Sequence, residues 1–240
     1  VLSRQDQKLM LSSPELTLRA DVTPREYSLQ VDRLSMDNPK TILSGQMQFD
    51  RSAERTTFFV KGDRLDLTEL RQRCRILFAK ARPVQKVLDI VQGGMLSDLR
   101  LSSSGATLKQ IGKNLKMKAL VDDGKVLVPD PELKLTDIQG KVAINNQVLD
   151  GRELSAGLDQ ARAWNGTMSL ALNKHVRPFS LQTEISGPAT LLPPILQQSV
   201  DSKPFLRELA RVSGVQGSLT GTLGLNRDQD HDMQISVQAR

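Results

Sequence analysis

Three segments of the chain gather side chains that could do chemistry, and the first surrounds a histidine. His231 is flanked by Asp228, Asp230 and Asp232, which together could hold a cation loosely. Their spacing fits no calcium-binding loop, and the distal glutamate of such loops is missing. We interpret this segment as the polar tip of a hairpin.

The other two candidates are His175, in a turn after a strand-like run, and Cys74, which lies between Arg73 and Arg75. Positive neighbours stabilise a thiolate, but no base accompanies this cysteine. One cysteine and two histidines cannot supply a cysteine-based zinc site or a three-histidine site. The glycine clusters fit no phosphate-binding loop. We expect no catalytic residue, no metal, no cofactor and no enzymatic activity.

The composition limits what kind of core the chain can build. Only 3% of its 240 residues are aromatic and 38% are apolar, so its apolar surface consists of Leu, Val, Ile, Ala and Met. Closed β-sandwiches and barrels usually recruit large rings to fill the middle. The shortage of rings also argues against nucleic-acid binding by base stacking.

Apolar and polar residues alternate along most of the chain, for example over Glu15–Val22, Phe179–Ile185 and Met233–Ala239. This period of two predicts antiparallel strands with one dry face and one wet face. We expect hairpin turns at Asn145-Asn146, at Asp150-Gly151 and at Asp122-Asp123-Gly124. The sequence therefore predicts a mainly β fold, in which a long antiparallel meander forms a curled open sheet or groove with a few short capping helices.

Four stretches have helical spacing instead: residues 66–79, 83–91 (ended by Gly93-Gly94), 107–115 and 203–212. They suggest an organisation in five parts. Strands of the groove occupy 1–65, a basic helical interruption with an intervening strand 66–115, a β-meander 116–187, a second helical interruption 188–213, and a hairpin 214–240. The last residues read as the middle of a strand, so we expect the chain to be an internal piece of a longer polypeptide.

The net charge of +6 is concentrated in one part of the chain. Between Lys61 and Lys118 there are thirteen basic and five acidic residues. Six of the basic residues follow one another with no acid between them: Arg71, Arg73, Arg75, Lys80, Arg82 and Lys86. Such a run can meet anionic lipid head groups or another polyanion. A solvated helix face is the alternative.

Several phrases resemble a known family. Leu133–Ile144 and Leu149–Ala156, with Gly124–Pro129 before them and Val215–Gly221 after them, resemble the AsmA-like family of Gram-negative bacteria, particularly its long YhdP- and TamB-type members. The resemblance is best over residues 90–240. It implies a periplasmic segment of an inner-membrane-anchored protein, whose signal and anchor lie outside this sequence. It also implies an open β-groove that shields phospholipid acyl chains moving between the inner and outer membranes.

The alternation defines which side chains would line that groove, since a strand cannot present adjacent residues to one side. We expect phospholipid or another acyl lipid, and neighbouring segments of the same longer chain, as partners, with no nucleic acid. The alternative is a structural scaffold or adhesin-type module with a closed core and no ligand. The expected lining residues are Leu133, Leu135, Val142, Ile144, Leu154, Leu158, Met168, Leu170, Leu172, Leu181, Ile185, Leu219, Leu223, Leu225, Ile235 and Val237. Lys134, Lys141, Ser155, Ser169, Gln182 and Gln234 should face water.

Overall fold

A computed structural model of the chain describes residues 2–4, 7–9, 15–37, 40–77, 88–129, 132–172, 178–191, 206–208, 210–211, 216–228 and 234–239. These residues form a 13-stranded antiparallel sheet and a separate two-stranded hairpin. The mainly β fold with an open sheet and few short helices is confirmed. The strands are β1 (Leu2–Arg4), β2 (Gln7–Leu9), β3 (Glu15–Val22), β4 (Glu26–Asp37), β5 (Lys40–Asp50), β6 (Arg55–Asp63), β7 (Leu65–Asp66), β8 (Val91–Gly105), β9 (Lys116–Pro129), β10 (Glu132–Asn145), β11 (Val148–Leu158), β12 (Ala161–Ala171), β13 (Phe179–Pro188), β14 (Ser218–Arg227) and β15 (Gln234–Ala239). The helices are α1 (Leu67–Leu77), α3 (Leu108–Lys113) and the 3-10 turn Ala189–Leu191.

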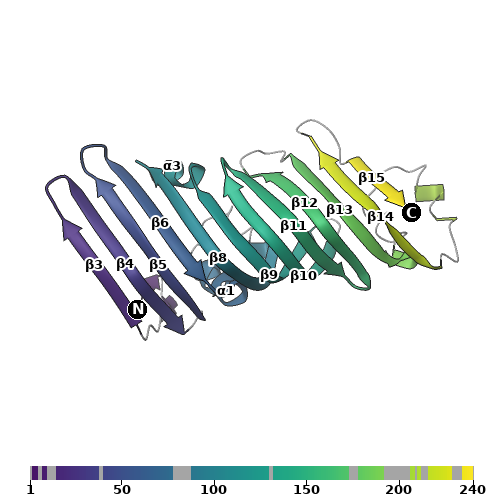
Figure 1. Cartoon of the computed structure of the whole chain (residues 1–240), viewed down its shortest axis with the longest axis horizontal. Coiled ribbons are helices and arrows are strands. Elements are labelled where there is room, and N and C mark those ends of the chain that lie inside the picture. The colour runs from purple at the N-terminus through teal and green to yellow at the C-terminus, as the bar shows by residue number, and fades with distance from the viewer. Residues whose placement is uncertain are drawn as a thin grey trace.

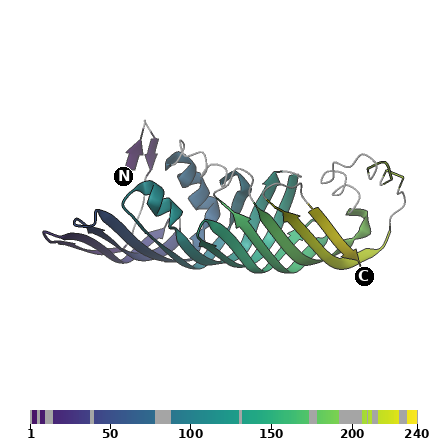
Figure 2. The ribbon, with the colours of Figure 1, turned by 90° about the horizontal axis from the view of Figure 1, so that it is seen from above.

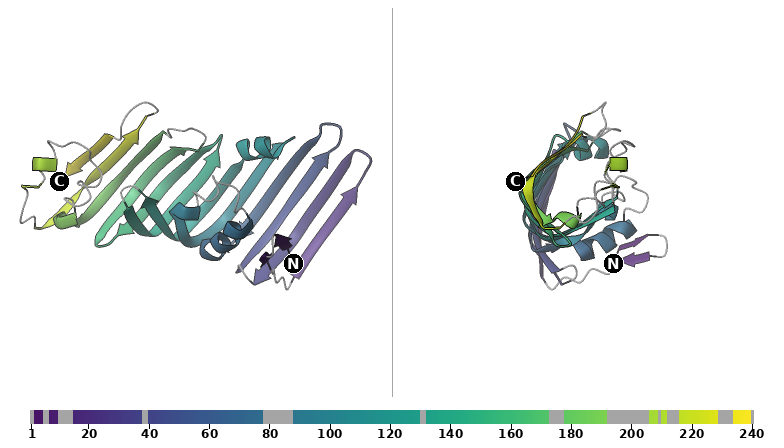
Figure 3. Two further views of the ribbon diagram at one scale, coloured as in Figure 1. Left: turned by 180° about the vertical axis from the view of Figure 1, so that it is seen from behind. Right: turned by 90° about the vertical axis from the view of Figure 1, so that its right-hand side faces the viewer.

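The sheet is a meander in which strands pair with their neighbours along the chain (Figure 1). One excursion interrupts the order: β7 and α1 follow β6, and β6 then pairs directly with β8. The two end strands, β3 and β15, lie at opposite ends of the molecule, so the sheet is not closed. Viewed along the long axis of the molecule, the sheet is C-shaped, with α1 and α3 on the inner, concave side (Figures 2 and 3).

Both helices begin at caps that the sequence supplies. The Asp66 carboxylate accepts hydrogen bonds from the backbone N–H groups of Thr68, at 2.8 Å, and Glu69, at 3.2 Å, which starts α1. At α3, the Thr107 hydroxyl accepts from the Gln110 N–H and the Gln110 side chain accepts from the Ala106 N–H. This arrangement resembles a capping box, except that the Gln110 side chain reaches the residue before the N-cap, Thr107.

The second expected helix, residues 83–91, is described only from residue 88 onward, and its expected end is wrong. Residues 88–90 are helical, but β8 begins at Val91, so Gly93 and Gly94 lie inside a strand and do not end a helix. Residues 83–87 lie outside the described part of the chain. Of the expected helix over 203–212, residues 206–208 are helical.

Two of the three expected hairpin turns are wrong. The turn near Asn145-Asn146 is present, with Asn146 and Gln147 at φ 49° and 62°. Asp150-Gly151 and Asp122-Asp123-Gly124 instead lie within β11 and β9. Asp123 marks a β-bulge in β9, because it has φ 48° and the register of the strand shifts beside it. Each strand from β8 to β12 carries one such residue: Asp98, Asp123, Asp137, Glu153 and Asn165.

These bulges account for the curl. A bulge bends its strand and increases the local twist, and here five neighbouring strands are each bulged beside a register shift. The sheet therefore bends in its middle part, from β8 to β12.

The chain has a very small core. The buried apolar side chains among the described residues are Leu65, Leu96, Leu99 and Ala119, and no large side chain there is fully buried. The exposed area is 16419 Å² for 26.6 kDa, whereas a compact protein of this mass exposes about 10,700 Å². Most apolar side chains therefore line a face of the sheet and do not fill a sealed interior.

Candidate functional site

The candidate site is the concave face of the sheet, and the strand register defines it. Residues directly opposite each other in an antiparallel pair project to the same face. Ala119 belongs to the core cluster, against which Leu67 and Leu70 of α1 pack, so its face is the concave one. From Ala119 the register runs through the pairs Ala119–Val142, Val142–Gly151, Gly151–Met168, Met168–Leu181, Leu181–Leu225 and Leu225–Ile235.

The register brings the expected lining residues of β10 to β15 to this face, and Leu172 lies just after β12. Leu154 follows the bulge at Glu153 and returns to the concave side, where it lies next to Gly140, Gly151 and Gly166. The side chains of Leu133 and Ile235 lie outside the description, although their backbones pair with Val128 and Leu225. That these residues bind lipid stays a prediction.

The residues expected to face water occupy the opposite, outer face. Lys141 is an example: its Nζ lies 2.6 Å from Glu153 Oε1, in an ion pair between two side chains that are both more than half exposed. Ser169 pairs with Asp150 and Ser180 on the same outer face. An exposed ion pair such as Lys141–Glu153 adds little to the stability of the fold.

The apolar face continues through the N-terminal strands, which the sequence-based lining set did not include. The pairs Leu18–Val31, Val31–Gly45, Gly45–Val60, Val60–Leu101 and Leu101–Met117 join it to the face of Ala119. The signal was present in the alternation of Glu15–Val22. These apolar side chains remain open to solvent: Leu16 is 53% exposed, Leu18 52%, Val22 71% and Met47 46%.

The two helices cover the middle of the concave face. α1 packs on β7 and β8, and α3 packs on β8. Ser103 of β8 donates its hydroxyl hydrogen to the Ile111 carbonyl, which ties α3 to the sheet. Toward the ends of the face Met47 and Val237 keep 46% and 40% of their surface exposed.

The predicted basic run is in part engaged within the chain. The Arg71 guanidinium donates to the Leu88 carbonyl, and Arg75 Nη2 lies 2.8 Å from Asp89 Oδ1. These contacts fasten α1 to the segment before β8. The Arg73 side chain, Lys80, Arg82 and Lys86 lie outside the described residues, so the anionic-surface patch stays a prediction.

The residues that first suggested chemistry form no site in what the structure describes. His175 and His231 lie outside it, and Cys74 is in α1, its side chain undescribed. Within the described ranges no three His, Cys, Asp or Glu side chains gather in a way that could hold a metal ion. Nor does any helix there have the length and apolar character needed to cross a membrane.

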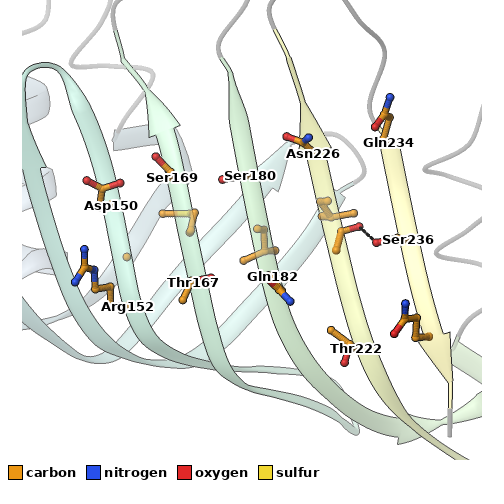
Figure 4. A pocket seen from close by; sticks show the side chains of 16 residues that line it. Asp150, Arg152, Thr167, Ser169, Ser180, Gln182, Thr222, Asn226, Gln234 and Ser236 are labelled. Atoms are coloured by element: carbon orange, nitrogen blue, oxygen red, sulfur yellow. Dashed lines mark hydrogen bonds between the residues drawn. The ribbon is translucent and has the colours of Figure 1, made fainter.

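The outer face carries a separate feature, a shallow depression of about 750 Å³ over β11 to β15 (Figure 4). It lies on the side of the sheet away from the apolar face, and hydroxyl and amide side chains line most of it. Sequence reasoning did not identify it, because its residues come together only through the register of five strands.

The fold and the site define a class of protein: an open, one-sided antiparallel meander whose concave face is apolar and partly covered by helices. No protein-family model matches the chain, and no match to it is found among the curated proteins or the solved structures. The likeness to AsmA-like proteins therefore rests on the sequence phrases quoted above.

Proposed function

We propose that the concave apolar face holds the acyl chains of lipids, and that the chain is a segment of a periplasmic bridge-like lipid-transfer protein. The observation that supports this most is the unbroken apolar face, which crosses twelve strands and stays open to solvent near both ends. Soluble proteins rarely expose contiguous apolar surface on this scale unless something binds to it.

The chemistry of the face suits acyl chains. Its Leu, Val, Ile and Met side chains offer methyl surface and few hydrogen-bonding groups. An acyl chain needs only methyl surface, because it has no hydrogen-bonding groups of its own. Each methylene buried there contributes about 0.8 kcal/mol. Eleven strand spacings of about 4.8 Å give a face roughly 50 Å long. A single leaflet contributes about half of a hydrocarbon core of about 30 Å, so several chains could lie along the face in sequence.

The head groups would remain outside the apolar face. Arg51 lies with its guanidinium carbon 4.0 Å from the centre of the Tyr27 ring, and that ring stacks on Phe49, whose side chain belongs to the concave face. A cation held beside apolar surface in this way could neutralise a lipid phosphate. In this proposal phospholipid passes between the inner and outer membranes, and neighbouring segments of a longer chain extend the path.

Site-specific photo-crosslinking tests the proposal. A photoreactive amino acid replaces Leu170, on the concave face, or Ser169, the adjacent residue on the outer face. A second matched pair is Leu29 and Gln30 of β4. After incubation with vesicles of phosphatidylethanolamine and phosphatidylglycerol, we expect covalent lipid at Leu170 and Leu29 and none at Ser169 and Gln30, read by mass spectrometry of the intact chain.

Equal capture at the inner and outer positions would contradict the proposal, because it would show non-specific adsorption. Absence of lipid at all four positions, together with native mass spectra and organic extracts free of lipid, would favour the alternative, a structural module without a ligand.

A further inference from the structure

The outer depression is lined mostly by polar side chains that make no hydrogen bond or ion pair with another described residue; Ser236, whose hydroxyl donates to the Gly224 carbonyl, is the exception. Asp150, Ser169, Ser180, Asn226 and Gln234 are directly opposite one another on five successive strands and form one row. None of these five side chains makes a hydrogen bond or ion pair with another described residue. Arg152, Thr167 and Gln182, also in the lining, are equally free in the described part of the chain. The depression therefore presents hydrogen-bonding groups to the outside (Figure 4).

The character of the outer face changes along the sheet. Over β8 to β10 it carries many charges: Asp98, Arg100, Lys116, Lys118, Asp122, Lys134 and Lys141. Over β12 to β15 its charged side chains are Arg162 and Glu184, and the others are mainly Ser, Thr, Asn and Gln. A sheet face that only needs to be soluble is usually charged. Hydroxyls and amides therefore make up most of the depression, and its two charged residues, Asp150 and Arg152, are of opposite sign and lie at its β11 edge. Such a surface suits a ligand that is itself uncharged and rich in hydrogen-bonding groups.

An aromatic residue shares a row of the outer face with Thr222 and Gln238, two residues that line the depression. Trp164 is opposite Glu184, Glu184 is opposite Thr222, and Thr222 is opposite Gln238, which gives a further row on the outer face. Trp164 Nε1 donates to Glu184 Oε2 at 2.9 Å, and Asn165 Nδ2 donates to Glu184 Oε1 at 3.0 Å. The half-buried indole is thus held in place with part of its surface open.

We propose that this outer polar surface, formed by the depression and Trp164, binds an uncharged oligosaccharide chain lying across the strands. Strands are about 4.8 Å apart, close to the length of one hexopyranose unit in an extended chain, so successive sugars would meet successive strands. Their hydroxyls would pair with the rows of Ser, Thr, Asn and Gln, and the apolar side of one ring would stack on Trp164. The surface lies on the opposite face from the lipid-binding proposal and does not depend on it.

Trp164 is the only tryptophan of the chain, so its fluorescence reports on this surface directly. The unmodified protein is titrated with cellohexaose, chitohexaose and maltohexaose. We expect a saturable change of the emission with at least one of them. The double substitution Gln182→Ala with Asn226→Ala removes two hydrogen-bonding groups and should weaken that binding about tenfold.

The matched control is Gln46→Ala with Gln48→Ala, two outer-face glutamines of β5 away from the depression, which should leave the affinity unchanged. Far-ultraviolet circular dichroism verifies that all variants keep their strands. The proposal is overturned if none of the three hexasaccharides changes the Trp164 emission or produces heat of binding in calorimetry at millimolar concentration. It is also overturned if the Gln182/Asn226 variant binds as tightly as the control.

Discussion

Leu154 occupies the space that a side chain at Gly140 would need. A Cβ atom on Gly140 would come within 2.7 Å of Leu154 Cδ2 and 3.0 Å of the carbonyl oxygens of Arg152 and Glu153. Gly140 also has φ +145°, a conformation that residues with a side chain rarely adopt. The bulge of β11 therefore sets Leu154 on the concave face directly over a glycine of β10.

This relationship predicts that Gly140→Ala destabilises the protein. The added methyl has no room, and the backbone would have to leave its present conformation, so we expect a loss of about 1–3 kcal/mol in the free energy of unfolding. Urea unfolding followed by circular dichroism measures it.

Gly112→Ala is the control for that prediction, because nothing lies within 4 Å of a Cβ built at this position in α3. Alanine favours helix over glycine by about 1 kcal/mol, so this variant should be as stable as the unmodified chain or slightly more. A Gly140→Ala variant as stable as Gly112→Ala would show that the sheet yields easily at the bulge.

The small core predicts an uneven response to leucine truncation. Leu99 is buried beneath the region where α1 packs, and Leu99→Ala should lower the free energy of unfolding by about 2–5 kcal/mol. Leu18→Ala, at an exposed position of the same face, should change it by no more than about 0.5 kcal/mol. Equal losses at both positions in thermal or urea unfolding would indicate that the end of the sheet is covered in solution.

A charge placed on the concave face should separate lipid binding from folding. Leu170→Asp can be hydrated on an open face, so we expect a folded protein that no longer takes up lipid, with Ser169→Asp as the outer-face control. Val142→Asp should behave differently, because Val142 packs against the core cluster and an unpaired carboxylate there costs several kcal/mol. Lipid extraction and circular dichroism give the two readouts, and unfolding of Leu170→Asp would contradict an open face.

The basic run predicts salt-sensitive binding to anionic surfaces. Replacing Arg71, Arg75 and Arg82 with Glu should weaken sedimentation with phosphatidylglycerol vesicles, most strongly at low salt. The matched control replaces Lys116, Lys118 and Lys134, exposed on the outer face, with Glu. Equal loss in both variants would point to net charge alone, and no binding by the unmodified chain would leave only a solvated helix face.

The alternation of residues predicted the strands well, because a half-solvated antiparallel strand depends mainly on its own sequence. It could not separate a turn from a bulge. Asp150-Gly151 and Asp123-Gly124 have the composition of hairpin turns, yet one is regular strand and the other adjoins a bulge, since the pairing partner decides which forms.

The candidate site, too, was predictable from the sequence only in part. Most of the inner face from Leu133 to Val237 follows from a period of two, which a bulge interrupts in each of β10, β11 and β12. The N-terminal extension through Leu18 was readable in the same signal but was not assigned to the lining. The outer rows around Ser180, and the contact of α1 with Leu96 and Leu99, depend on which strands become neighbours and on bulges that shift their register. No single strand carries that information.

The connectivity of the sheet has a consequence for how the protein is made. Apart from the excursion between β6 and β8, each strand pairs with a strand next to it along the chain, so most pairing closes only a short loop. Pairing between strands that are neighbours in the chain favours faster folding than pairing between distant strands. Each new hairpin can add to the edge of the sheet as it is synthesised, without waiting for distant sequence. Opening would likewise begin at the ends of the sheet and advance strand by strand, as it does in quasi-one-dimensional arrays.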